Sequence, residues 1–324
     1  MSQFEAQIVS QPAGLDAMLA DATVRQQVHA AAEGLHRVRR IWVVGTGSSQ
    51  HVAALGAGML QDAGRSAHAV SSMQFVRNAP IVGPHDGVVV VSHSGESAYA
   101  LAARALAFAA GLQTVTITHR GTALNDAVET VDREPVDTSS LGTTSAALAF
   151  AMVVAQMGAE NITDEAIALV PASVRHAIED PGVDGVPADA RSVTFVGAGP
   201  AAVTAAEGAL KLREAARVPA LGADAEYVLH GAVSHLTPQD HLVALTVPDE
   251  DGFVAGVAAA AEGEGIGLTR VTEVAPLPSI LAQIPAMVRL QILALRAAIA
   301  RGVDPDAPFT GRWADPSLRS IGAP

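Results

Sequence analysis

The 324-residue sequence predicts an α/β fold made of two tandem units, each a parallel β-sheet flanked by helices. Two observations predict it: short β-branched runs alternate with alanine-rich stretches, and a strand–glycine–helix pattern near residue 41 occurs again near residue 193. Apolar residues make up 49% of the chain, but aromatic residues only 3%. The cores are therefore expected to consist mainly of Ala, Val, Leu and Ile in close helix–sheet contact.

Three buried strands are predicted in the first half: Ile41–Gly45, Val88–Ser92 and Thr114–Ile117. Their apolar character is continuous rather than alternating, which is typical of strands covered on both faces of a parallel sheet. The alanine-rich stretches at about 49–62 and 96–110 are predicted as the helices that connect these strands.

The uncharged stretch 138–159 needs to be tested as a membrane span. Its first eight residues are a hydroxyl-rich loop, and only about fourteen apolar residues follow, too few to cross a bilayer. We expect a buried core helix here and no contact of the protein with a membrane.

A Pro-, Gly- and Asp-rich segment at 180–187 is predicted as a linker between a domain at 1–180, with leading helices, and a domain at 190–324, with a C-terminal tail. After the linker the pattern starts again, because residues 41–47 align with residues 193–199 at an offset of 152. The match continues into the following helix. It predicts two copies of one α/β unit, each a flavodoxin-like three-layer sandwich.

The second half is completed by two more predicted strands and a long helix. The strands are Leu242–Val247 and Gly267–Val271, and the helix runs from Pro285 to about Arg301. Pro285 is suited to the first helical position and Gly302 to the C-terminal cap.

The charge balance excludes several classes of partner and site. Acidic residues outnumber basic ones 33 to 20, a net charge of −13, so binding to nucleic acid is not expected. The absence of cysteine excludes disulfides, thiolate metal sites and a Cys nucleophile. The same absence fits a cytoplasmic protein. The first five residues, Met1–Glu5, show no basic region and no apolar segment, so no signal peptide is visible.

The turn Gly45–Gln50 lies between a predicted strand and a predicted helix, as a dinucleotide-binding fingerprint would. Gln50 stands where the third glycine belongs, and no acidic residue ends a second strand about 20 residues on. The glycines are better explained by close approach of some other ligand to the carboxyl edge of the strand.

The turn Ser92–Ser97 has the same placement and carries three serines at a helix N-terminus, where free amides bind anions. Thr143, Thr144 and Ser145 repeat this arrangement at the start of the apolar helix. Each turn alone is explained by ordinary N-capping. Three such turns from one sheet, without a nearby Lys or Arg, together indicate an uncharged phosphate-binding cradle.

Glu207, Lys211 and Glu214 lie on one face of a predicted helix in the second half. One interpretation is a surface ion-pair ladder, worth about a few tenths of a kcal/mol. The other is a carboxylate base, Glu214, with the Lys211 ammonium nearby to hold developing negative charge. His230 follows sixteen residues later as a structural or catalytic histidine, and no His or acidic cluster has metal-ligand spacing.

These segments resemble the sugar isomerase (SIS) family, and within it the isomerase half of glucosamine-6-phosphate synthase. The resemblance rests on the run Ser92–Ser97, which is similar to the family's Ser-Gln-Ser-Gly-Glu-Thr, and on Glu207–Glu214, which is similar to Glu-Gly-Ala-Leu-Lys-Leu-Lys-Glu. It extends from about residue 5 to 305 and implies two tandem SIS domains, both needed for one site.

The resemblance also implies roles for individual residues. Phosphate binding is implied for Ser49, Ser92, His93, Ser94 and Ser97, and lining of the sugar for Leu141 and Thr143.

Lys211 and Glu214 match the pair that moves the proton between C1 and C2. His230 matches the ring-opening histidine, which in that enzyme reaches into the neighbouring subunit's site. The resemblance therefore implies a homodimer with shared active sites.

Three departures from the family pattern concern specificity. His93 replaces Gln, and Ala232 stands where a proline usually follows the His-Gly pair. The tail begins as in the family at 304–308 but continues as 309–313 without the expected lysine. Arg312 is the candidate replacement cation over the sugar, although arginine and lysine are not interchangeable.

The implied chemistry is aldose–ketose proton transfer, which needs no metal or organic cofactor. The synthase takes nitrogen from glutamine through a domain with an N-terminal Cys nucleophile, and this chain contains no cysteine. Aldose–ketose isomerisation and the deaminating direction remain. Because the Lys211–Glu214 segment resembles the amino-sugar branch of the family, we expect the deaminating reaction, from glucosamine 6-phosphate to fructose 6-phosphate and ammonia. Two alternatives are a deglycase for fructosamine-type sugar–amino acid 6-phosphates and a non-catalytic phosphosugar sensor, which requires the cradle but neither Lys211 nor Glu214.

Overall fold

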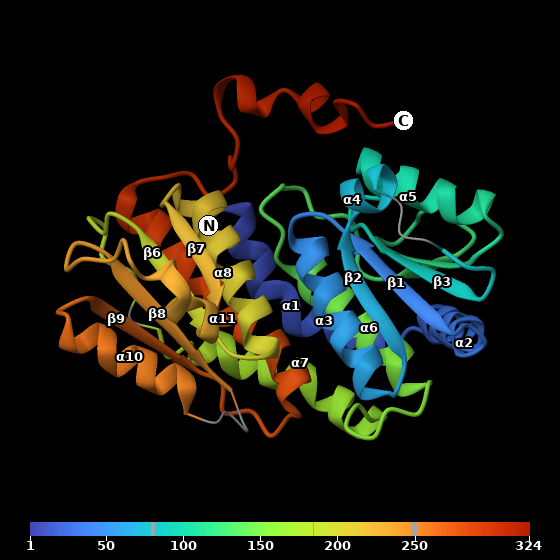
Figure 1. Ribbon diagram of the computed structural model, residues 1–324, viewed down its shortest axis with the longest axis horizontal. Helices are drawn as coiled ribbons and strands as arrows, with labels where there is room; N and C mark the ends of the chain where they lie inside the picture. Colours follow the sequence, from blue (N-terminus) through green and yellow to red (C-terminus); the bar gives the residue numbers. More distant parts are fainter. Residues whose placement is uncertain (79–81, 184, 248–251) are drawn as a thin grey trace. The chain divides into compact units, whose positions relative to one another are not determined.

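The computed structural model describes residues 1–78, 82–183, 185–247 and 252–324 and contains two parallel β-sheets (Figure 1). The first sheet has the strand order β2-β1-β3-β4-β5 and the second has the order β7-β6-β8-β9. All strand pairs are parallel, and helices flank each sheet. The predicted α/β fold class is confirmed.

The chain forms two compact units that are not continuous in sequence. The β1–β5 unit contains residues 13–134, 141–169 and 310–324, and the remaining residues from 1 to 309 belong to the β6–β9 unit. Each sheet lies within one of the two predicted ranges, 1–180 and 190–324. Two helices, α1 (Gln3–Ala20) and α7 (Asp164–Glu179), contribute residues to both units.

The β1–β5 unit is built from five strands, five helices and two short 3-10 turns of the tail. They are β1 (Arg40–Gly45), β2 (Ser66–Ser71), β3 (Asp86–Val91), β4 (Gln113–Thr118), β5 (Ala127–Glu129), α2 (Ala22–His36), α3 (Ser48–Asp62), α4 (Ser72–Arg77), α5 (Ala98–Ala109), α6 (Leu141–Ala155), η2 (Gly311–Ala314) and η3 (Pro316–Ser320).

Two layers of helices enclose this sheet. Helices α4 and α5 pack on one face, where Phe75, Val88 and Val90 belong to one apolar cluster. Helix α3 packs on β1 and β2 and also against α6. Every residue of α6 from Leu141 to Val154 is buried, so the predicted core helix is confirmed.

The β6–β9 unit is built from four strands and the helices around them. They are β6 (Val193–Gly197), β7 (Ala220–Asp224), β8 (His241–Thr246), β9 (Gly267–Thr272), α8 (Pro200–Ala216), α9 (Ala225–Tyr227), the π-helical turn η1 (Val228–Ala232), α10 (Phe253–Gly263) and α11 (Ser279–Arg301). Helix α8 packs on β6 and β7 and against α11, while α10 packs on β8 and β9.

The predicted start of the last helix is wrong. Helix α11 begins at Ser279, six residues before Pro285, so Pro285 lies inside the helix and Pro278 is the N-cap. The predicted end is confirmed, because Gly302 adopts a left-handed conformation and its N–H bonds to Ala298 and Ile299. The sequence pattern also missed the edge strands β2, β5 and β7. Strands β2 and β7 are only partly buried, and β5 has three residues.

The same backbone turn follows the central strand of each unit. A Cβ at Gly45 or at Gly197 would lie 2.3 Å from the backbone carbonyl oxygen four residues on, so neither position has room for a side chain. Gly47 and Gly199 have φ values of +57° and +53°, a region that favours glycine. The offset of 152 seen in the sequence therefore corresponds to repeated geometry.

In both units an arginine–aspartate pair lies at the amino ends of the central strands and connects them through hydrogen bonds. Asp86 accepts a hydrogen bond from Arg40 at 2.6 Å, and Asp240 accepts one from Arg191 at 2.5 Å. Each aspartate also accepts a bond from the backbone N–H three residues earlier, at 2.9 Å. The two aspartates are related by an offset of 154 rather than 152, so a fixed-offset comparison does not reveal this pair.

The predicted linker at 180–187 has no helix or strand among its described residues, but it is packed. Val183 is buried, with an exposed fraction of 3%. Arg289, Arg296 and Arg301 of α11 each donate a hydrogen bond to a backbone carbonyl between residues 180 and 188. The segment is thereby fixed to the β6–β9 unit.

The substitution Asp240→Asn should lower the free energy of unfolding by roughly 1–3 kcal/mol, because the buried carboxylate accepts several hydrogen bonds while its arginine is half exposed. The bond from Arg191 holds the pKa of Asp240 well below its usual range. Its stabilising effect is thus present above about pH 4 and is lost as the pH falls through the folded-state pKa.

Urea unfolding of the wild type and the variant at pH 7 and pH 3 measures this effect. Asp62→Asn, at an exposed aspartate, is the matched control and should change stability little. An equal loss in both variants at pH 7 would contradict the bracing role of Asp240.

Candidate functional site

The β1–β5 unit contains a topological switch point between β1 and β3. These strands are neighbours, but the chain leaves β1 through α3 toward β2 and leaves β3 through α5 toward β4, on the opposite side. Ligands of open parallel sheets bind outside the carboxyl ends of the strands at such a point. The turns 45–50 and 92–97 both start there.

The first turn presents the N-terminus of α3 without a side-chain cap. Gly47 is the N-cap residue and makes no capping hydrogen bond through a side chain. Ser49, a predicted phosphate ligand, is half-buried in the first turn of this 15-residue helix. Backbone amides and hydroxyls are therefore concentrated at the end of β1, as the sequence predicts.

The second turn also uses few of its hydroxyls for capping. The Ser92 hydroxyl is buried, with a residue exposure of 4%, and has no hydrogen-bond partner among the described residues. Ser97 is the N-cap residue of α5, but its side chain makes no capping bond. Ser94 Oγ accepts a bond from the Glu96 N–H at 3.2 Å, which leaves its own O–H to be donated elsewhere. Ordinary N-capping does not explain these serines.

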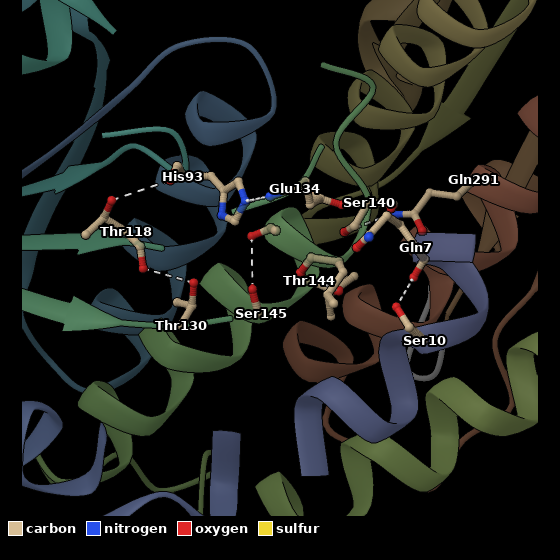
Figure 2. Close-up of polar contacts among 12 residues, drawn as sticks. Gln7, Ser10, His93, Thr118, Thr130, Glu134, Ser140, Thr144, Ser145 and Gln291 are labelled. Atoms are coloured by element: carbon tan, nitrogen blue, oxygen red, sulfur yellow. Dashed lines mark hydrogen bonds and ion pairs between the residues drawn. The ribbon is translucent and has the colours of Figure 1, made fainter. Parts of the chain in front are cut away.

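The side chain of His93 is held in one orientation by its neighbours (Figure 2). Its Nε2 accepts a hydrogen bond from the backbone N–H of Glu134 at 3.1 Å, and its backbone oxygen accepts bonds from Thr118 and His119. Because Nε2 is an acceptor, the proton of the neutral ring is assigned to Nδ1. This Nδ1 is buried and has no partner among the described residues.

The carboxylate of Glu134 lies beside His93 and has an exposed fraction of only 2%. Its Oε2 is 3.8 Å from His93 Nε2. A Cβ at Gly142, in the first turn of α6, would lie 2.5 Å from Glu134 Oε2 and 2.7 Å from His93 Cγ. Only glycine at position 142 therefore leaves room for the pair.

Burial lowers the pKa of His93, since the charged ring would lose its hydration. The Glu134 carboxylate acts in the opposite direction, while His119 and Arg133 lower the pKa further. His93 is thus a neutral hydrogen-bond donor in the free protein at pH 7.

The third turn contributes less than the sequence predicts. Thr144 and Ser145 donate their hydroxyl hydrogens back to the carbonyls of Leu141 and Gly142, within α6 (Figure 2). The Leu141 side chain packs against α1, 3.1 Å from where a Cβ on Gly14 would lie. Thr143, the third of these hydroxyl residues, is buried.

The C-terminal tail is attached to the same unit next to the second turn. Arg77 of α4 donates a hydrogen bond to the Gly322 carbonyl at 2.6 Å, and the Tyr99 hydroxyl of α5 donates one to Ile321 at 3.3 Å. Tyr99 follows Ser97 by two residues, so this attachment is adjacent to the serine turn. Arg312, the predicted cation over the sugar, is exposed in η2.

The β6–β9 unit contains a buried cluster of charges on α8. Lys211 and Glu207 each have an exposed fraction of 1%, and the Glu214 side chain is 17% exposed. Lys211 Nζ lies 2.6 Å from Glu214 Oε2 and 3.6 Å from Glu207 Oε1. The surface-ladder interpretation is wrong, because the lysine is inside the protein between two carboxylates.

Burial raises the pKa of Glu214. The ammonium of Lys211 opposes this shift by charge and by hydrogen bonding, and the second carboxylate, Glu207, adds to it. A carboxyl group whose pKa is raised toward neutrality is suited to accept and return a proton, and a fixed ammonium beside it stabilises negative charge on a reacting oxygen.

His230 lies apart from this pair in the contacts described. It is exposed in η1, and the adjacent Gly231 has a φ of +116° that turns the chain. Tyr227 and Leu229 beside it are also exposed, by 62% and 60%. The structure thus brings together Lys211 and Glu214 in one unit and Ser92, His93 and Ser94 in the other, while it leaves His230 at the surface.

Sequence reasoning missed Glu134, because nothing in its local sequence indicates that it contacts His93. It left open whether Lys211 is exposed or buried. Lys211 is the only lysine in the sequence, and all other Lys/Arg positions are arginine, which is a signal that sets this residue apart.

Comparison with known proteins places part of this chain in a family. Residues 34–157, which include β1–β5, match the family model of the SIS domain. This segment is a SIS domain.

The whole chain is similar to longer curated proteins. It is 25% identical, over 91% of its length, to glutamine–fructose-6-phosphate aminotransferase (isomerizing) of Gloeobacter violaceus, and 26% identical, over 88% of its length, to the protein of that name from Thermococcus kodakarensis. The chain spans about half the length of these relatives, 54% and 53%.

Solved structures share the fold at lower identity. Glucosamine-6-phosphate deaminase from Thermotoga maritima superimposes with a TM-score of 0.78 at 16% identity, covering 95% of this chain and 97% of that one. Tagatose-6-phosphate ketose/aldose isomerase from Escherichia coli superimposes with a TM-score of 0.79 at 18% identity, covering 94% and 95%. At these identities the likeness supports the fold of the whole chain.

Two further properties concern the described part of the chain. Helix α11 is long and apolar enough to cross a bilayer, but 94% of its apolar window is buried inside the protein, as in a core helix. Within residues 1–78, 82–183, 185–247 and 252–324, no group of three or more His, Asp or Glu side chains is placed to hold a metal ion.

The substitution Lys211→Met should lower the free energy of unfolding by about 3–5 kcal/mol at pH 8, because it leaves two buried carboxylates without a cation. Protonation of these carboxylates relieves the repulsion, so the loss should be smaller at pH 5. Urea unfolding at both pH values measures the difference. Equal losses at pH 5 and pH 8 would contradict the described charge cluster.

Proposed function

We propose that the protein is a hexosamine-6-phosphate deaminase that converts glucosamine 6-phosphate and water into fructose 6-phosphate and ammonia. The observation that carries this proposal is the buried Lys211–Glu214 pair, a proton-transfer couple with an attached cation. The SIS domain at 34–157 and the serine turn within it support a sugar phosphate as the substrate.

In the proposed reaction the phosphate is held by the turns after β1 and β3, through Ser49, Ser92, His93, Ser94 and Ser97. Neutral donors and helix N-termini bind the dianion without a basic side chain. Proton transfer at the other end of the open-chain sugar is assigned to the Lys211–Glu214 pair.

The Glu214 carboxylate removes the proton from C2, which carries the amine, and the electron pair shifts toward the C1 oxygen, where the Lys211 ammonium stabilises the negative charge. Glu214 returns the proton to C1, and the C2 nitrogen gives one proton to the C1 oxygen, so that the product is the C2 imine of the ketose. Water adds to this imine, and ammonia leaves. His230 is proposed to open the sugar ring beforehand.

We also propose that the β6–β9 unit is a second SIS domain and that the protein acts in the cytoplasm as a homodimer. The repeated glycine turn and the matching strand order support the first part. The exposed apolar side chains of Tyr227 and Leu229 beside His230 support the second, because a partner protomer would cover them. His230 would then serve the site of that partner.

The wild-type protein should release ammonia from glucosamine 6-phosphate, and Glu214→Gln should lower kcat/KM by about 10²–10⁴-fold, because the amide cannot accept the C2 proton. Coupled detection of ammonia measures this, with Glu226→Gln, at an exposed glutamate of α9, as the matched control. Release of an amino acid from a fructosamine 6-phosphate instead would indicate a deglycase. Ligand-induced thermal stabilisation without any turnover would indicate a sensor.

The pH dependence of kcat/KM should show an acidic limb set by Glu214. Because burial raises the pKa of this carboxyl, the limb should lie above 4.5, the usual value of glutamate. Activity is expected to be lost as the pH falls through the raised pKa, since the protonated group is no base. A profile that stays flat down to pH 4.5 would exclude Glu214 as the base.

A further inference from the structure

The serine turn after β3 contains two buried polar atoms, on consecutive residues, without partners among the described residues: Ser92 Oγ and His93 Nδ1. Buried polar atoms are nearly always hydrogen-bonded, so two exceptions in one turn need an explanation. Ser92 has an exposed fraction of only 4%, and both groups are donors when the His93 proton is on Nδ1. Each can therefore donate a hydrogen bond to a ligand that binds at this turn.

The other ring nitrogen of His93, Nε2, lies close to the carboxylate of Glu134. His93 Nε2 accepts the backbone N–H of Glu134 at 3.1 Å, and Glu134 Oε2 lies 3.8 Å from the same nitrogen. The carboxylate is nearly fully buried, so its charge is weakly screened. A proton on Nε2 would therefore meet a carboxylate oxygen close by.

The other charged or titratable groups around His93 oppose its protonation. The His119 ring, from the end of β4, packs edge-on at a centroid distance of 6.3 Å. Arg133, on the loop before α6, adds positive charge, although Glu96 pairs with its guanidinium at 2.6 and 2.7 Å. In the free protein these groups and burial outweigh Glu134, and the ring is neutral.

A phosphate dianion at Nδ1 reverses this balance, because it brings two negative charges into hydrogen-bond contact with the ring. We propose that binding of a phosphomonoester dianion at the serine turn is coupled to uptake of one proton by His93, with the Glu134 carboxylate as the counter-ion. This inference rests on the proposed function, in which the same turn holds the phosphate of the substrate.

The proton balance of this step is simple. Nδ1–H donates to a phosphate oxygen, and a proton from solvent adds to Nε2. The Glu134 N–H loses its acceptor, and Glu134 Oε2 accepts the new Nε2–H after a small movement from 3.8 Å. No bond to phosphorus changes. A glutamine at this position, which the SIS resemblance implies as the usual residue, has no titratable group and cannot take up a proton.

Binding of the phosphomonoester dianion is therefore accompanied by binding of a proton to His93. The affinity for the phosphomonoester should decrease as the pH rises. Full uptake of one proton corresponds to about a tenfold loss of affinity per pH unit. This effect is separable from protonation of the phosphate itself, whose second pKa is about 6.

Isothermal titration calorimetry with glucitol 6-phosphate, an unreactive open-chain phosphomonoester, tests the proposal. Titrations at pH 7.5 in buffers of different ionisation enthalpy give the number of protons taken up. We expect at least half a proton per site for the wild type and close to none for His93→Gln. His29→Gln, at an exposed histidine of α2, is the control and should behave like the wild type.

Equal proton uptake in the wild type and His93→Gln would overturn the proposal while leaving phosphate binding intact. Failure of the wild type to bind the probe at all would instead overturn the proposed function. If His93→Gln does not fold, ¹⁵N NMR of the imidazole groups in the wild type decides. The proposal requires both ring nitrogens of His93 to be protonated in the complex, and an unprotonated Nε2 there would contradict it.

Discussion

The pairing of β1 with β3 is the constraint on which the fold of the SIS domain and the turns after these two strands depend. Because the chain leaves these neighbouring strands in opposite directions, the turns that lead into α3 and α5 start at adjacent strand ends. The glycine turn after β1 needs the space that Gly45 and Gly47 leave, and the serine turn after β3 is anchored to the end of β4 through the backbone of His93. The buried Ser92 hydroxyl and His93 Nδ1 of the serine turn have no hydrogen-bond partner among the described residues.

The two units carry different side chains on the same backbone turn. The turn after β6 repeats the glycine geometry but carries alanine and proline where the first unit has hydroxyl residues. The buried charged groups of this unit lie instead on α8, where an ammonium is held between two carboxylates. A lysine in this position is informative, because arginine serves everywhere else in the chain. A compact ammonium fits between two buried carboxylates that a planar guanidinium would force apart.

Much of the fold could be predicted from the sequence, because buried parallel strands have continuous β-branched runs and the repeat at offset 152 reflects a real backbone turn. The edge strands and the start of α11 could not, since β2 and β7 are only partly apolar and Pro285 is tolerated inside a helix. At the site, the serines and the Lys211–Glu214 pair could be predicted from spacing and resemblance. The Glu134–His93 contact could not, because it joins residues 41 positions apart through a backbone N–H. The sequence also did not predict that the hydroxyls of Thr144 and Ser145 donate hydrogen bonds to backbone carbonyls of α6.

The central claim is that uncharged donors of the SIS domain bind the phosphate of a hexosamine phosphate and that Glu214 transfers the proton between C1 and C2. A crystal structure with 2-amino-2-deoxyglucitol 6-phosphate tests this most directly, since this open-chain analogue has the substrate's phosphate and amine but no carbonyl to react. The account predicts the phosphate among Ser92, Ser94 and Ser97, with a Glu214 carboxylate oxygen about 3–3.5 Å from C1 or C2, as near-attack geometry requires. A phosphate bound outside these turns, or carbons C1 and C2 out of reach of Glu214 in every protomer, would contradict it.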